Sequence, residues 1–156
     1  MYKNKIMVHK ALDIAKTFTT FVNPEYGDFL SNLKIQKLLY YAQGFSLALN
    51  HTPLFEEKIV AWQYGPVVEE VYQELQSYSG SIPAFNEQDD SYLTDGEIEL
   101  LKEVYDVYGQ FSATKLVEMT HNEIPWKTTA IRKEINHQKL RRHFLTLVQD
   151  EQTEKN

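Results

Sequence analysis

The chain has 156 residues, no cysteine, 42% hydrophobic and 24% charged residues, and a formal net charge of −6. This length fits one compact domain, and ten tyrosines and eight phenylalanines argue against disorder. The missing cysteines exclude disulfides, thiolate metal sites and thiol catalysis, and they favour a cytoplasmic location. The acidic balance disfavours broad binding to nucleic-acid phosphates. No apolar run is long enough for a membrane span, and the first ten residues lack the apolar stretch of a secretory signal.

The first predicted helix runs from about Val8 to Val22, with its apolar residues on one face. A polar loop then leads to Leu33–Asn50, which is apolar nearly all round. A helix of that kind is normally buried on both sides, so we expect it to be the central helix of the fold. Ser31 or Asn32 is expected to cap its start. Its core stripe is expected to contain Leu38, Ala42, Phe45 and Leu49.

A short extended segment is predicted near residues 58–63, because these residues are rich in β-formers. Gly65 is expected to make a sharp turn in a backbone conformation that is costly for a residue with a Cβ. That turn should bring Trp62 near Trp126. Pro66 suits the first position of the next helix, predicted over 66–78, because no N–H is needed there. Residues 79–91 are predicted to form a loop.

Capping signals mark the remaining helices. Thr94 and Glu97 fit a capping box that opens a helix to Tyr108, and Gly109 is expected to end it in the left-handed conformation. Helices capped by Ser112 and Asn136 follow, with a further helical turn beginning at Trp126 and a frayed polar tail over 151–156.

The predicted fold class is therefore mainly α. It is a compact single-domain bundle of about six to seven helices around the central buried helix, with one short extended segment, and the domain spans residues 1–150.

Charge is distributed unevenly along the chain. Residues 87–106 hold eight acidic residues against Lys102, and residues 127–142 hold six basic residues against Glu134. These stretches are two solvated faces, or an acidic patch for a basic partner, or a basic patch for nucleic acid, and the residues alone leave the choice open.

Motifs of known catalytic sites are absent from the sequence. There is no G-x-S-x-G, no G-x-x-x-x-G-K, no H-E-x-x-H and no G-x-G-x-x-G. His121 and Glu123 are the nearest approach to an acid–base or metal pair. The alternative for His121 is a hydrogen-bonded side chain beside Trp126 that holds a turn shut. We expect no enzyme, no catalytic residue, no cofactor and no metal site.

Several motifs resemble the SocA-like antitoxin domain, also called Panacea, which occurs in phage-associated proteins. The first block comprises LKIQKLLYYAQGFSLAL (Leu33–Leu49), PLF (Pro53–Phe55) and AWQYGPVVEEVY (Ala61–Tyr72). LVEMTH (Leu116–His121) and PWK (Pro125–Lys127) resemble its second block, and the resemblance runs from about residue 8 to 148. Met119 replaces the usual Leu there. Ile124 replaces the usual Gly before Pro-Trp, which alters the expected path of the chain.

The resemblance implies an antitoxin that neutralises a cognate toxin, encoded by a neighbouring gene, through direct protein–protein binding. The alternatives are an adaptor that delivers its toxin to a protease, and a nucleic-acid-binding autoregulator that uses residues 127–142. Nucleic acid and membranes are not expected as partners, and a homodimer is left open. The candidate partner-binding or motif residues are Lys37, Tyr40, Tyr41, Trp62, Tyr64, Gly65, Pro66, His121, Pro125 and Trp126.

Three of these residues are expected to contact the partner, because the core does not obviously need them. They are Lys37 and Tyr40 on the second face of the central helix, and Tyr64 at the turn. The alternative for Lys37 is a side chain whose stem packs while its charge reaches water.

Overall fold

Helices make up most of the fold. The structure is a computed structural model that describes residues 8–26 and 29–155. The helices are α1 (Ala11–Thr19), α2 (Asn32–Asn50), α3 (Glu69–Leu75), α4 (Asp95–Tyr108), α5 (Ala113–His121), α6 (Ile124–Lys127) and α7 (His137–Lys155), with a 3-10 turn η1 (Pro24–Tyr26). Strands β1 (Ile59–Trp62), β2 (Gly65–Val67) and β3 (Glu134–Ile135) form a small antiparallel sheet in the order β2-β1-β3. The predicted mainly α fold class is confirmed.

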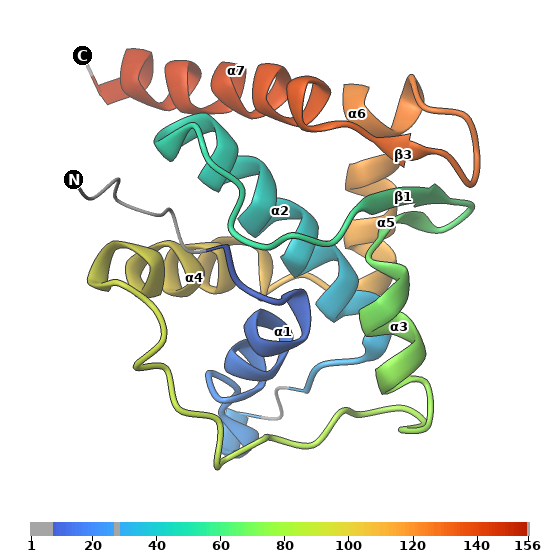
Figure 1. The fold of residues 1–156 in the computed structure, drawn as a ribbon, viewed down its shortest axis with the longest axis vertical. Helices are drawn as coiled ribbons and strands as arrows, with labels where there is room; N and C mark the ends of the chain where they lie inside the picture. Colours follow the sequence, from blue (N-terminus) through green and yellow to red (C-terminus); the bar gives the residue numbers. More distant parts are fainter. Residues whose placement is uncertain (1–7, 27–28, 156) are drawn as a thin grey trace, which may run out of the picture.

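Helix α2 passes through the middle of the fold, with α7 on one side and α1 and α4 on the other (Figure 1). Every side chain from Ile35 to Ala48 is buried except Phe45, which is partly buried. Ser31 caps the helix by accepting a hydrogen bond from the Lys34 N–H at 3.1 Å. The prediction of a central buried helix is confirmed, but Leu49 is 50% exposed and lies outside the core stripe.

Helices α2 and α7 pack closely against each other at Gly44. A Cβ at position 44 would lie 2.2 Å from two ring carbons of Phe144. The Phe144 ring is fully buried and packs edge-on against Tyr40 and Tyr41, with centroids 5.3 and 5.9 Å away. A glycine is therefore what allows the two helix backbones to come this close.

The expected helix start at Pro66 was wrong. Pro66 lies in strand β2, opposite Ala61 of β1, and α3 begins only at Glu69. Strand β2 is an edge of the sheet, where a residue without an N–H is tolerated. The prediction for Gly65 is confirmed, since its φ is +105°, a conformation that L side chains rarely adopt. The sheet also contains β3, which the sequence pattern did not indicate.

Other helix boundaries follow local capping. The capping box of Thr94 and Glu97 is present, and α4 has the predicted bounds. The left-handed stop at Gly109 was wrong: its φ is −66°, because its N–H continues to the Tyr105 carbonyl at 2.7 Å. Ser112 and Asn136 cap α5 and α7 as predicted. Helix α1 is shorter than expected.

The predicted loop over 79–91 contains no helix, and it is tied to the rest of the chain where Ile82 pairs with Leu30. Within the described ranges, no helix has the length and apolarity needed to cross a membrane.

Candidate functional site

Lys37 lies inside the protein. None of its surface is exposed, and its Nζ donates to the Pro66 carbonyl at 3.1 Å. No carboxylate of the described residues lies within ion-pair distance of it. Burial lowers the pKa of this amine to about 7, because the charged form is poorly solvated there. The expectations that Lys37 contacts a partner or reaches water were both wrong.

Gly65 packs directly against the end of the Lys37 side chain. A Cβ on this glycine would lie 2.7 Å from the Lys37 Cε and 2.8 Å from the Thr120 Oγ1. The positive φ and the crowding together demand glycine. The glycine turn, the buried lysine and helix α5 therefore form one packed unit.

Two glutamines of α2 hold neighbouring segments in place, and sequence reasoning did not single them out. The Gln36 Oε1 accepts from the Val68 N–H at 2.9 Å. The Gln43 Oε1 accepts from the N–H groups of Leu54 and Phe55, and its Nε2 donates to the Phe55 carbonyl. Both side chains are fully buried, so these bonds replace water for backbone groups outside regular structure. Their roles are structural.

Tyr40 and Tyr41 bind one partly buried carboxylate. Their hydroxyls donate to the two oxygens of Glu123, each at 2.9 Å, and both tyrosines are fully buried. Burial raises the pKa of Glu123, and the two hydroxyls act in the opposite direction. Burial also raises the pKa of both tyrosines. Tyr40 is thus part of the core, contrary to expectation, and Glu123 bonds to the tyrosines and not to His121.

A histidine borders this carboxylate from the other side. The Nε2 of His143 on α7 lies 4.0 Å from a Glu123 oxygen and makes no hydrogen bond. Burial lowers the pKa of His143. The partly buried Glu123 therefore joins α2, the start of α6 and α7.

Tyr40→Phe should lower the free energy of unfolding by about 1.5–3 kcal/mol at pH near 7.5, the usual range for a hydrogen bond to a charged group. Losing one donor raises the pKa of Glu123 further, and the loss should shrink near pH 4, where the acid is protonated in both proteins. Urea unfolding at both pH values measures this. Tyr26→Phe, at an 80% exposed tyrosine, should change little. An equal loss at both pH values would contradict the carboxylate role.

His121 and Trp126 fasten the β1–β2 hairpin. The His121 Nε2 lies 2.9 Å from the Gln63 carbonyl, and its ring stacks on Trp126 with centroids 4.1 Å apart. The Trp126 Nε1 donates to the Trp62 carbonyl at 2.8 Å. The alternative of a hydrogen-bonded His121 beside Trp126 is confirmed, but His121 fastens the β1–β2 hairpin and not its own turn. The nearness of the two tryptophans is confirmed. Pro125 is buried in α6 beside them.

Tyr64 alone among the candidate residues is strongly exposed. It lies at the tip of the hairpin, with 61% of its surface exposed. The neighbouring Gln63 is held by His121 and Gly65 by the Lys37 unit, so the tip is braced on both sides. The β1–β2 hairpin lies at one edge of the fold (Figure 1), and its braced backbone presents the tyrosine to solvent.

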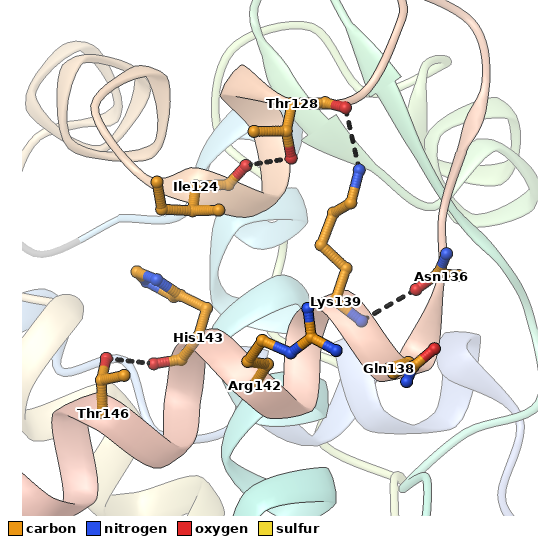
Figure 2. A pocket seen from close by; sticks show the side chains of 8 residues that line it. All are labelled: Ile124, Thr128, Asn136, Gln138, Lys139, Arg142, His143 and Thr146. Atoms are coloured by element: carbon orange, nitrogen blue, oxygen red, sulfur yellow. Dashed lines mark hydrogen bonds between the residues drawn. The ribbon is translucent and has the colours of Figure 1, made fainter.

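A hollow of about 500 Å³ lies between α6 and the first turns of α7. Figure 2 shows Ile124 and Thr128 on one side, and Lys139, Arg142 and His143 of α7 on the other. Asn136, Gln138 and Thr146 complete the lining, which contains no acidic residue. Ile124 is 55% exposed there. Within residues 8–26 and 29–155, no three His, Asp or Glu side chains gather as metal ligands would.

Comparison with known families gives one match. The sequence model described as Antitoxin SocA-like, Panacea domain, matches residues 35–127. This range covers more than half of the chain, from α2 through α6, and it includes Lys37, the hairpin and Glu123. No curated protein and no solved structure matches the chain significantly.

Proposed function

Because the chain belongs to the SocA-like Panacea antitoxin family, we propose that it neutralises a cognate toxin through direct protein–protein binding. The toxin would be the product of a neighbouring gene, and both proteins would act in the cytoplasm. One observation carries the proposal beyond family membership. The motif residues of α2 turn inward, and one of them, Lys37, donates to Pro66 of a hairpin that presents an exposed aromatic side chain.

The contrast between the two kinds of motif residue supports a binding role. Lys37, Tyr40 and Tyr41 are fully buried and engage other parts of the chain. Tyr64 is exposed on a rigid turn, and tyrosine is enriched among the residues that dominate binding energy at interfaces. A backbone already held in place loses little conformational entropy on binding, which favours affinity.

The basic stretch at 127–142 supports nucleic-acid binding less well. Its Lys139 donates to the Thr128 carbonyl and to the Thr129 Oγ1, and its Arg141 pairs with His51. Two of its six cations therefore already serve the fold. We propose protein binding, with promoter binding as an outcome to be tested.

Co-expression with the neighbouring gene tests the function. The expected result is that the toxin stops growth alone, that growth resumes with this chain, and that the two proteins co-purify as a stable complex. Protection without a complex would contradict direct neutralisation. A protease-dependent fall in toxin level would indicate an adaptor. Retention of the promoter fragment alone would indicate an autoregulator.

Tyr64→Ala should weaken the complex by about 2 kcal/mol, or roughly thirtyfold in Kd, as loss of an aromatic interface anchor does. The thermal midpoint should stay near the wild-type value, because the side chain is 61% exposed. Tyr26→Ala is the matched control: Tyr26 is 80% exposed in η1, away from the hairpin, and its loss should leave affinity unchanged (Figure 1). Equal affinities of the two variants would exclude the hairpin from the interface.

A further inference from the structure

The hollow between α6 and α7 is lined by cations, although the chain as a whole is acidic. The net charge is −6, but Lys139 and Arg142 line this hollow and no carboxylate does. Its one strongly apolar side chain, Ile124, is 55% exposed. An exposed apolar residue beside two cations suits an acidic segment that also carries an apolar side chain.

Helical spacing places the cations on one wall. Lys139, Arg142, His143 and Thr146 are separated by three or four residues, so they share one stripe of α7. A neighbouring stripe contains Leu140 and Phe144, which are fully buried. The lining side chains therefore project from a helix that is itself fixed in the core.

The Lys139 amine is held in position before any partner arrives. It donates to the Thr128 carbonyl at 2.8 Å and to the Thr129 Oγ1 at 3.0 Å, which leaves one of its three N–H groups for another acceptor (Figure 2). A cation fixed in advance loses less entropy when a carboxylate binds it.

Arg142 is the complementary group. It is exposed, and its side chain makes no hydrogen bond or ion pair with the described residues. Its planar guanidinium can bind a carboxylate through two parallel hydrogen bonds, which adds geometric specificity to charge attraction.

We propose that this hollow, lined by Ile124, Lys139 and Arg142, is a docking site for an acidic segment of the cognate toxin. A carboxylate of the segment binds Arg142 and the remaining N–H of Lys139, and an apolar side chain of the segment covers Ile124. This inference rests on the proposed function and adds the chemical character of the partner surface.

The test measures the Kd of the complex with the purified product of the neighbouring gene, at low and at moderate salt. Arg142→Glu should raise Kd on the order of tenfold or more at low salt, and Ile124→Asp should do the same, because each opposes a feature of the segment. Lys102→Glu is the matched control. It makes the same change in net charge at an exposed position on α4 and should leave Kd within about twofold.

The other outcomes contradict the docking site alone, or the docking site together with the proposed function. If the wild type binds and Arg142→Glu binds equally tightly with its thermal midpoint intact, the docking site is wrong and the proposed function stands. If the wild type does not bind the neighbouring product, the function fails and the docking site fails with it. If Arg142→Glu leaves Kd unchanged but abolishes binding of promoter DNA, the hollow binds nucleic acid. If it leaves Kd unchanged but abolishes a concentration-dependent dimer, the hollow binds a second copy of this chain.

Discussion

Gly44→Ala should lower the free energy of unfolding by about 3 kcal/mol, at the upper end of the range for overpacking a core. The added Cβ would lie 2.2–2.5 Å from three atoms of the Phe144 ring. That ring is fully buried and packs against Tyr40 and Tyr41, so it has no free space to move into. The strain can be relieved only by moving α7 away from α2. Thermal unfolding should show a midpoint roughly 6–12 °C lower.

Two further variants separate overpacking from a general effect of losing glycine. Gly96→Ala makes the same change in α4, where the nearest atom to the new Cβ is 4.0 Å away, and it should stabilise by about 0.5–1 kcal/mol. Gly44→Ala combined with Phe144→Leu should recover part of the loss, because the smaller side chain leaves room for the methyl group. If the single Gly44→Ala variant melts within a degree or two of the wild type, the close approach of α2 and α7 is not as described.

Lys37→Met should stabilise the protein at neutral pH. The fold lowers the pKa of Lys37 from its ordinary 10.5 to about 7, so between these values the unfolded chain binds more protons than the folded one. Wild-type stability therefore rises with pH across this window and is lowest below it. Methionine removes the desolvation penalty of several kcal/mol but leaves the Pro66 carbonyl without its donor, at about 1–3 kcal/mol. A net gain of about 2 kcal/mol near pH 7 is expected.

The pH profile distinguishes this mechanism from a simple gain in packing. The difference between Lys37→Met and wild type should shrink by up to about 1.4 kcal/mol per pH unit above pH 7, and it should reverse at about pH 9. Urea unfolding at several pH values measures it. Lys102→Met, at an exposed lysine, should run parallel to the wild type. A difference that does not vary with pH would mean that the Lys37 amine is not desolvated.

The elements that sequence predicted best are those whose signals are local. Helix α4 has its predicted bounds because the Thr94–Glu97 capping box fixes the start of the helix through residues that are close in sequence. Helix α2 was predicted to be the central helix because it is apolar on nearly all sides, and only a helix that is packed on both sides can bury such a surface. Pro66 was misassigned because its fixed φ suits both a first helical turn and an edge strand, and the choice between them is made by pairing with β1.

Tertiary contacts explain what the sequence could not predict about the site. Lys37 was expected at the surface because charged lysine is almost always solvated, and only the enclosing Gly65 turn shows that its amine is buried. Glu123 lies 83 and 82 residues from Tyr40 and Tyr41, so no spacing rule connects them. The bracing of the hairpin was predictable in part, since His121, Trp126 and the glycine turn were all singled out from sequence.

The covering of α2 by α7 has a consequence for synthesis in the cell. Phe144 is synthesised roughly ninety residues after the end of α2. At about 5–20 residues per second, that delay lasts roughly 5–20 s. During that interval the nascent chain exposes the side of α2 that α7 later covers, a surface for chaperones and proteases. The protein therefore becomes resistant to degradation only late in translation, and messages cut short before Phe144 should yield products that are rapidly destroyed.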